Sequence, residues 1–353
     1  MHIALIAHSR HPIREPFAGG LESMTWHLAQ ALLARGHEVT LFAAPGTEPM
    51  PGLRLLEVRT LRLSEAALRD PSTPNPEWVH ISHAYLQVVR YLSRHPEIDV
   101  VHNNSLHYLP LVMAATIGKP MLTTLHTPPT PWLESGVQLM EDDASSFVAV
   151  SRHTAESWSH LVAADVVPNG VDTDAWQPGP GGGPLLWSGR MVPEKAPHLA
   201  IQAARRAGLE LQLAGPVSDP RYFAAEVQPL LDDRVRYVGH LGRAGLARLL
   251  GSASAALVTP AWDEPYGLVA AEALACGTPV AGFACGGLPE VVPDHVGRLV
   301  PTGDVAALAQ VLPEVRGLSR TLARQTAVER CSLDVMVERY LGLYSAMSAR
   351  DAA

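Results

Sequence analysis

The residues best suited to chemistry lie between Glu264 and Glu272, two carboxylates separated by seven residues. Tyr266, Gly267 and Leu268 stand between them, where a loop enters a predicted helix. The first backbone N–H groups of a helix have no partner within the helix and carry partial positive charge. Free amides beside carboxylates suit a ligand that bears both phosphates and hydroxyls. A sugar nucleotide is such a ligand.

A second set of candidate residues lies upstream and is cationic. Gly189 and Arg190 follow a predicted strand over 185–188, and Lys195 falls in the first turn of a helix predicted over 194–207. Two cations beside a helix start form an anion site. Only two of the chain's 27 basic residues are lysines, so a lysine here indicates a need for a compact point charge. A solvated surface lysine is the alternative interpretation.

Composition narrows the class of protein. A chain of 353 residues with 47% hydrophobic and 18% charged residues is globular and long enough for two domains. Its net charge of -8 argues against nucleic-acid binding, which needs a basic surface. The three cysteines have neither metal-ligand spacing nor an even count, which favours a reducing cytoplasm. We expect no metal site, no secretory signal and no membrane-spanning segment.

Short apolar runs alternate with amphipathic segments along the whole chain, which predicts an α/β fold with parallel, doubly wound sheets. A dense Gly/Pro run over 177–184 interrupts this alternation and predicts a linker. We therefore expect one doubly wound domain over 1–176 and another over 185–334. Apolar residues at helical spacing predict a last helix over 335–347.

Five residues of the first domain are weaker candidates. Gly19 and Gly20 open a helix and allow close approach of an anion to backbone amides. His126 follows a predicted strand, at the sheet edge where open parallel sheets bind ligands. Asn103 and Asn104 end another strand and fit the acceptor side of a transfer site. A structural role fits these two asparagines equally well.

Together these segments resemble the signature of the retaining, nucleotide-sugar-dependent glycosyltransferases that include sucrose synthase and bacterial mannosyltransferases (glycosyltransferase family 4, glycosyl transferases group 1). The resemblance covers nearly the whole chain and is most specific in its second half. The chain departs from the family pattern in two places. The residue after Lys195 is Ala196 where the family has glycine, and His126 is followed by Thr127 where the family has aspartate.

The resemblance implies the GT-B fold, in which two Rossmann-like domains face each other across a cleft and the last helix, here 335–353, returns to the first domain. It also implies a metal-independent reaction without a cofactor, most often with a UDP-sugar as donor. In that family the Arg and Lys hold the diphosphate, the first Glu binds the transferred sugar and the second Glu binds the ribose. The implied donor-binding residues are Gly19, Gly20, Gly189, Arg190, Lys195, Glu264, Tyr266, Gly267, Leu268 and Glu272, with His126, Arg190, Lys195 and Glu264 as the catalytic set.

Other functions remain open at this point. A GT-B sugar phosphorylase, a nucleotide-sugar epimerase and a non-catalytic nucleotide-sugar-binding protein would each need part of the same site. The scattered basic residues of the first domain favour a soluble small molecule or saccharide as acceptor over a membrane lipid.

Overall fold

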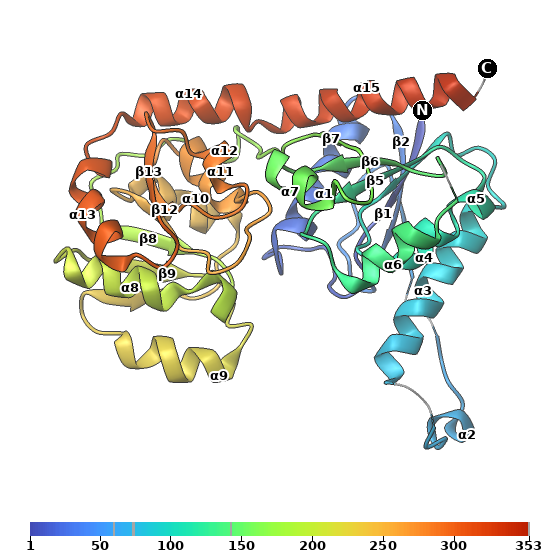
Figure 1. Cartoon of the computed structure of the whole chain (residues 1–353), viewed down its shortest axis with the longest axis horizontal. Coiled ribbons are helices and arrows are strands. Elements are labelled where there is room, and N and C mark those ends of the chain that lie inside the picture. The colour runs from blue at the N-terminus through green and yellow to red at the C-terminus, as the bar shows by residue number, and fades with distance from the viewer. Residues whose placement is uncertain (59–60, 73–74, 142, 352–353) are drawn as a thin grey trace. The chain divides into compact units, whose positions relative to one another are not determined.

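The computed structural model describes residues 1–58, 61–72, 75–141 and 143–351, which form two compact units (Figure 1). The first unit comprises Met1–Val150, Ala155–Val167 and Val337–Ala353. The second comprises Ser151–Thr154 and Pro168–Met336. Each unit is built on one parallel sheet with helices on its faces, so the predicted α/β, doubly wound architecture is confirmed.

The first unit has a seven-stranded sheet in the order β3-β2-β1-β4-β5-β6-β7. Its strands are β1 (His2–Ile6), β2 (Glu38–Ala43), β3 (Leu53–Glu57), β4 (Val100–Asn103), β5 (Met121–Leu125), β6 (Ser146–Ala149) and β7 (Ala164–Val166). The central strands β1, β4 and β5 are fully buried, whereas β3 at one edge is only partly covered. That exposure gives β3 a mixed sequence, which explains why it was not predicted.

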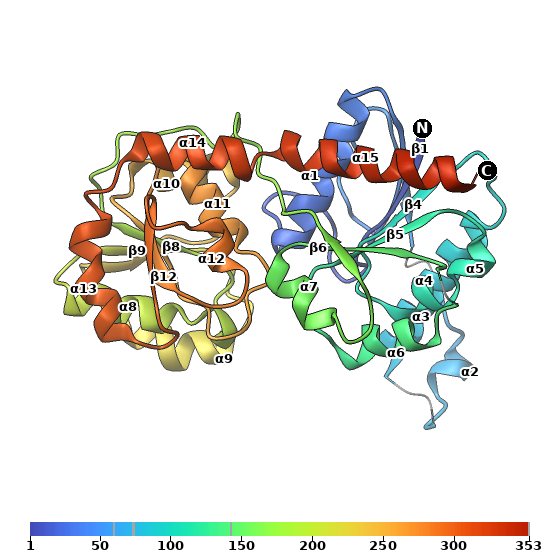
Figure 2. The same cartoon turned by 45° about the horizontal axis from the view of Figure 1, so that its top comes forward.

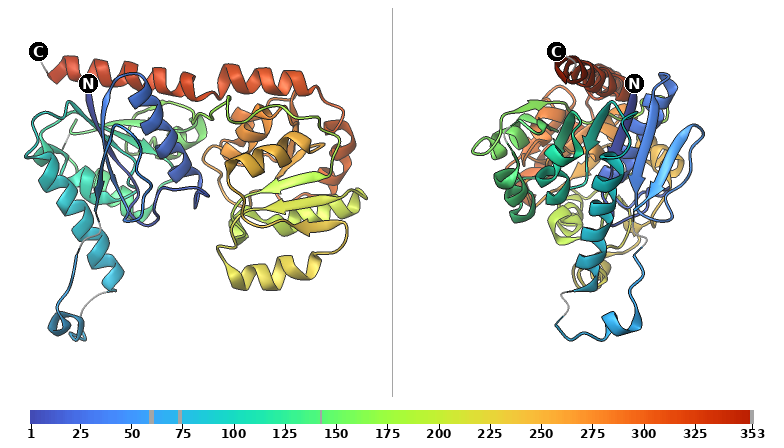
Figure 3. Two further views of the ribbon diagram at one scale, coloured as in Figure 1. Left: turned by 180° about the vertical axis from the view of Figure 1, so that it is seen from behind. Right: turned by 90° about the vertical axis from the view of Figure 1, so that its right-hand side faces the viewer.

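Seven helices of this unit lie between successive strands. They are α1 (Gly20–Ala34), α2 (Glu65–Leu68), α3 (Pro76–Leu92), α4 (Tyr108–Val112), α5 (Ala114–Ile117), α6 (Pro131–Leu139) and α7 (Arg152–Trp158). The last helix, α15 (Leu333–Asp351), follows the second unit in the chain, and its residues from Val337 onward belong to the first unit. Asn75 and Thr130 cap the starts of α3 and α6, each followed by proline at the first helical position. The first turns of α3 extend toward α2, away from the sheet (Figures 1 and 3).

The second unit has a six-stranded sheet in the order β10-β9-β8-β11-β12-β13. Its strands are β8 (Leu185–Ser188), β9 (Leu211–Ala214), β10 (Val235–Tyr237), β11 (Ala256–Val258), β12 (Val280–Phe283) and β13 (Gly297–Val300). Its helices are α8 (Pro197–Arg206), α9 (Pro220–Tyr222), α10 (Arg243–Ser252), α11 (Leu268–Ala275), α12 (Leu288–Val291), α13 (Val305–Val315) and α14 (Arg320–Arg330), with short turns η1 (Pro193–Lys195), η2 (Phe223–Val227) and η3 (Gln228–Leu230).

Both sheets reverse their winding direction once. The reversal lies between β1 and β4 in the first unit and between β8 and β11 in the second. Connections leave the two central strands in opposite directions at such a point, which opens a crevice at the carboxyl ends of the strands. Each unit therefore has one expected ligand-binding position, and the predicted site residues lie after strands of the two sheets.

The Gly/Pro run over 177–184 is packed on the second unit. Gly181 and Gly183 donate backbone hydrogen bonds to Gly251 and Ser252, both at 2.9 Å. A Cβ on Gly179 would lie 2.5 Å from the backbone of Gly251, so glycine is needed there for close packing. The two units divide at Val167, before this run, and the assignment of 177–184 as the linker stays a prediction.

From Val337 onward the last helix, α15, belongs to the first unit (Figure 2). A buried polar network holds it there. Burial lowers the pKa of His102, on β4, to about 3, so its imidazole is neutral. One ring nitrogen therefore donates and the other accepts: Nδ1 is hydrogen-bonded to the Tyr344 hydroxyl at 2.6 Å and Nε2 to Thr124 Oγ1 at 2.7 Å. Tyr340 stacks beside Tyr344 and contacts Thr124.

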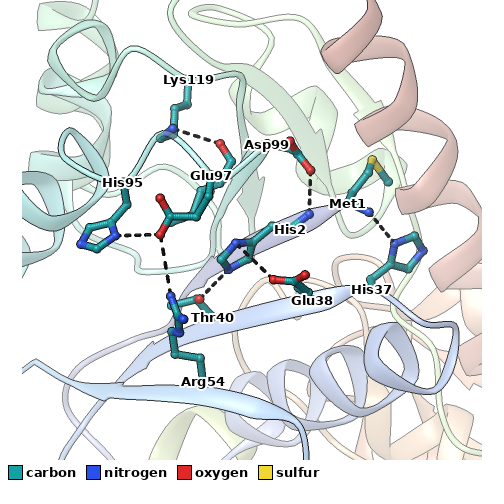
Figure 4. A network of polar contacts seen from close by, with 11 residues as sticks. Met1, His2, His37, Glu38, Thr40, Arg54, His95, Glu97, Asp99 and Lys119 are labelled. Atoms are coloured by element: carbon teal, nitrogen blue, oxygen red, sulfur yellow. Dashed lines mark hydrogen bonds and ion pairs between the residues drawn. The ribbon is translucent and has the colours of Figure 1, made fainter.

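The amino ends of the first unit's strands carry a separate polar cluster (Figure 4). The backbone N–H of His2 donates to Asp99 at 2.7 Å, and its ring contacts Thr40. Lys119 donates to the carbonyl of Ile98. These contacts tie β1, β2 and β4 together at the edge opposite the carboxyl ends, and we assign them a structural role.

Removing the Tyr344 hydroxyl tests how α15 is held. We expect Tyr344→Phe to lower the free energy of unfolding by about 1–3 kcal/mol, because His102 Nδ1 is left buried without a partner. Tyr91→Phe is the control, since the Tyr91 hydroxyl makes no hydrogen bond within the described residues. Urea unfolding of both variants gives the comparison, and equal stabilities would contradict this role for the network.

Candidate active site

The central contact of the second unit joins Lys195 and Glu264. Lys195 follows β8 and Glu264 follows β11, and these parallel strands are neighbours in the sheet. Their carboxyl ends therefore lie at the same edge, which brings the two loops together. The Lys195 ammonium is paired with the Glu264 carboxylate, and the two side chains are 23% and 12% exposed. The sequence predicted both residues for one site, and the structure places them in direct contact.

Lys195 is held by its backbone as well as its side chain. Thr259, at the end of β11, donates its hydroxyl to the Ala196 carbonyl at 3.1 Å and accepts from the indole of Trp187 at 3.1 Å. Lys195 lies in the 3₁₀ turn η1 and not in the first turn of α8, which corrects the predicted helix start. The cause is Ala196, whose φ of 44° is left-handed and separates the two helices. Glycine adopts that conformation more easily than alanine.

Sequence reasoning missed Trp262, which contacts both members of the pair. Its indole N–H donates to Glu264 at 3.3 Å, and the Lys195 ammonium lies 5.1 Å from the ring centroid. A cation over an indole face is stabilised by the ring quadrupole. The available signal was its position two residues before Glu264 in the same loop.

The loop that carries Glu264 is fixed by a neighbouring glycine turn. Gly287 N–H donates to the Glu264 carbonyl at 2.7 Å. A Cβ on Gly286 would lie 2.1 Å from that carbonyl oxygen, and one on Gly287 would lie 2.4 Å from the carbonyl oxygen of Pro265. Two adjacent glycines are therefore required for this packing, which fixes the position of the Glu264 backbone.

The predicted helix over Glu272 is observed as α11. Gly267 precedes it with a φ of 98°, and the first intrahelical bond is donated by Ala270 N–H, which leaves the amides of Leu268 and Val269 without an acceptor in the helix. Burial raises the pKa of Glu272 to about 8. The Tyr266 side chain is buried at 4% exposure, so only its backbone is available to a ligand.

Arg190 lies in the same loop as Lys195, directly after Gly189, and pairs with Glu194 at 3.6 Å. Both members of this pair are substantially exposed, with side-chain exposures of 42% and 38%. An exposed pair of this kind contributes little stability, so Arg190 exchanges partners easily. A Cβ on Gly215 would lie 1.9 Å from the Gly189 carbonyl oxygen, so the loops after β8 and β9 touch through their backbones.

The first unit places His126 beside Asn104. The His126 ring is 2.7 Å from Asn104 Oδ1, and burial lowers the pKa of His126 to about 3. A neutral His126 donates Nε2–H to this amide oxygen, which leaves Nδ1 as an acceptor. Asn104 Nδ2 is buried and has no partner within the described residues. Asn103 instead bonds Ser105 and Thr123, which is a structural role.

The structure places Gly19 and Gly20 at the start of α1, as predicted. Glu22, in the first turn of this helix, is buried, and its carboxylate lies 3.1 Å from the Cβ position that Gly19 lacks. A carboxylate at that place already interacts with the positive end of the helix. An anion bound there would have to compete with Glu22.

Among the described residues, no three His, Cys, Asp or Glu side chains gather as a metal site requires. No helix within the same residues is both long and apolar enough to span a bilayer.

Comparisons with known proteins identify the class of this fold and site. The model described as "Glycosyltransferase Family 4" matches residues 18–175, and the model described as "Glycosyl transferases group 1" matches residues 181–317. A D-inositol 3-phosphate glycosyltransferase from Mycobacterium avium is 30% identical over 92% of this chain and 89% of its own. The chain therefore belongs to this glycosyltransferase family.

Solved structures agree on the fold. Sucrose-phosphate synthase from Thermosynechococcus elongatus superposes with a TM-score of 0.78 at 22% identity, over 99% of both chains. Anabaena Alr3699/HepE in complex with UDP-glucose superposes with a TM-score of 0.75 at 18% identity, over 98% of this chain and all of the other. The expected GT-B class with two Rossmann-like domains is confirmed.

Trp262 provides a direct test of how the site is held together. Trp262→Phe keeps a ring for Lys195 but removes the hydrogen bond to Glu264, so we expect glycosyl transfer to fall about tenfold in kcat/KM. Trp262→Leu removes both contacts, so its kcat/KM should be lower still. Trp176→Phe, a buried tryptophan of the same unit, controls for general destabilisation. Unchanged kcat/KM in both Trp262 variants would show that the indole does not position the pair.

Proposed function

We propose that this chain is a retaining, metal-independent glycosyltransferase that transfers a sugar from a UDP-sugar to a hydroxyl group of a soluble acceptor in the cytoplasm. The family membership supports the transfer reaction. The complex of Anabaena Alr3699/HepE with UDP-glucose supports the choice of uridine donor. The curated relatives named D-inositol 3-phosphate glycosyltransferases support a ring-bearing polyol or saccharide as acceptor.

The Lys195–Glu264 pair at the reversal point of the second sheet carries this proposal. A cation and a carboxylate side by side match a ligand in which a phosphate adjoins a hydroxyl-bearing sugar. Donor binding would part them, so that Lys195 binds the diphosphate and Glu264 accepts hydrogen bonds from the sugar hydroxyls. Trp262 N–H would keep Glu264 oriented after the lysine leaves.

Stabilisation of the charge on the leaving diphosphate would account for the rate enhancement. When the bond between sugar and phosphate breaks, negative charge grows on the diphosphate while the sugar becomes oxocarbenium-like. Lys195, Arg190 and the amides at the start of α11 stabilise the leaving group as preorganised positive charge. This is the task that a divalent ion performs in metal-dependent transferases. His126 Nδ1, an acceptor in its neutral form, would orient a hydroxyl of the transferred sugar.

Product analysis tests this function. The purified chain, supplied with UDP-glucose or UDP-N-acetylglucosamine and a panel of polyols and saccharides, should release UDP in the presence of excess chelator. The product anomer should keep the configuration of the donor by ¹H NMR. Release of a sugar 1-phosphate that depends on free phosphate would indicate a phosphorylase, and donor binding without any turnover would indicate a binding protein.

The two lysines of the chain form a matched pair for this assay. Lys195→Ala should lower transfer by roughly 10²-fold or more, which is the scale for losing one preorganised charge stabiliser. Lys119→Ala should leave transfer unchanged, because Lys119 bonds a carbonyl at the amino edge of the other unit. Equal activities in the two variants would contradict the assignment of Lys195.

The raised pKa of Glu272 predicts pH-dependent binding of UDP. With a pKa of about 8, the free carboxyl is largely protonated at neutral pH. Ribose hydroxyls donate to the ionised form, so binding releases a proton and affinity should rise between pH 6 and pH 8, by up to about tenfold per unit. Calorimetry of the wild type and Glu272→Gln separates this effect from titration of the phosphate. The same pH slope in both proteins would show that the ribose does not bind Glu272.

A further inference from the structure

The first unit carries a cluster of aromatic rings that the proposed donor chemistry does not use. Trp132 contacts Trp78 and Tyr108, each at 5.1 Å between ring centroids, and His107 at 5.4 Å. His107 also stacks on Tyr108 at 4.6 Å. These four residues are called the aromatic platform.

The platform lies at the ligand-binding edge of its sheet. Tyr108 opens α4, which follows β4, and Trp132 opens α6, which follows β5. The same two strands end at Asn104 and His126, whose side chains are hydrogen-bonded to each other. Trp78 joins from the first turn of α3. The platform therefore continues from the proposed acceptor side of the site on elements that the same two strands position.

This surface combines an exposed ring with buried polar atoms that have no partner. Trp78 is 47% exposed although it packs against another tryptophan, which leaves a large apolar area in water. His107 is 3% exposed, and its Nδ1 accepts from Leu109 N–H, so Nε2 carries the proton. Nε2 has no hydrogen-bond partner within the described residues, and neither has the buried Asn104 Nδ2. A ligand that has an apolar face and hydroxyl oxygens could cover the exposed ring and accept hydrogen bonds from the unpaired N–H groups.

The charges nearby do not suit an anion. No lysine or arginine contributes to the platform, and the charged residues nearest to its tryptophans in sequence are Glu77 and Glu134. An adjoining pocket of about 400 Å³ is lined by both Arg10 and Glu77, whose charges are opposite. A phosphate group finds no excess of positive charge here.

We propose that the aromatic platform binds the acceptor of the transfer reaction and that this acceptor is a neutral saccharide or glycoside. The C–H face of a sugar ring packs on Trp78 and Trp132, and its hydroxyl oxygens accept from His107 Nε2–H and Asn104 Nδ2–H. This assignment rests on the proposed glycosyltransferase function and selects a neutral acceptor over a phosphorylated polyol.

Binding is measured without a donor, so the test does not depend on turnover. Saturation-transfer NMR with the full-length chain uses p-nitrophenyl β-D-glucopyranoside and D-inositol 3-phosphate as probes. We expect the neutral glycoside to bind, and Trp78→Ala and Trp132→Ala each to weaken binding about tenfold. Trp78→Phe should restore part of the affinity. Leu86→Ala, which truncates another exposed residue of α3, should have no effect.

Three results would overturn the inference: no binding of the glycoside to the wild type, unchanged binding in both alanine variants, or D-inositol 3-phosphate binding at least as strongly as the glycoside. Release of UDP by the wild type, followed with the panel of donors and acceptors, distinguishes failure of this inference from failure of the proposed function. If UDP is released but the platform variants bind the glycoside normally, the inference fails while the proposed function stands. If no UDP is released from any donor or with any acceptor, the proposed function fails.

Discussion

The Lys195–Glu264 ion pair is the interaction on which the account of the second unit depends. Neither residue belongs to a long helix or a strand, so their contact has to be imposed by the surroundings. Pairing of β8 with β11 brings the loops together, Thr259 fixes the backbone at Ala196, and Gly286 allows the Glu264 loop to pack closely. Trp262 then contacts both side chains. Removing the two charges from water costs free energy, which would favour separation of the two side chains into solvent. The surrounding contacts hold the side chains together against that tendency.

The pairing also explains how one site holds cations and carboxylates together in the absence of ligand. Lys195 is neutralised by Glu264 and Arg190 by Glu194. A diphosphate with a sugar attached would replace both carboxylates at the cations and give Glu264 hydroxyl partners. In this exchange Glu194 would be left to water, to which it is already exposed. Glu272 differs from both carboxylates, because burial favours its neutral acid and the proposed ribose contact would favour its ionised form.

Sequence reasoning succeeded where a pattern has one physical meaning. The alternation of apolar and amphipathic segments predicted two parallel sheets. The resemblance to the glycosyltransferase family implied that Lys195 and Glu264 lie together, and the structure shows them in contact. Sequence reasoning failed where structure depends on contacts between distant segments. Thr259 and the Tyr344–His102 network have no local signature, since each acts through a partner that is distant in the sequence. Trp262 has only its position beside Glu264, and its contact with Lys195 joins two separate loops. The prediction of the Gly/Pro run as a linker from its composition stays a prediction. The close packing of Gly179 and Gly183 against the end of α10 could not be read from that composition.

Co-crystallisation with UDP tests the central claim most directly. We predict that in the complex Lys195 Nζ lies within about 3 Å of a phosphate oxygen and has left Glu264, while Trp262 N–H still donates to the Glu264 carboxylate. Glu272 should accept from the ribose hydroxyls in the same crystal. A complex in which Lys195 remains on Glu264 and the diphosphate binds elsewhere would contradict the account.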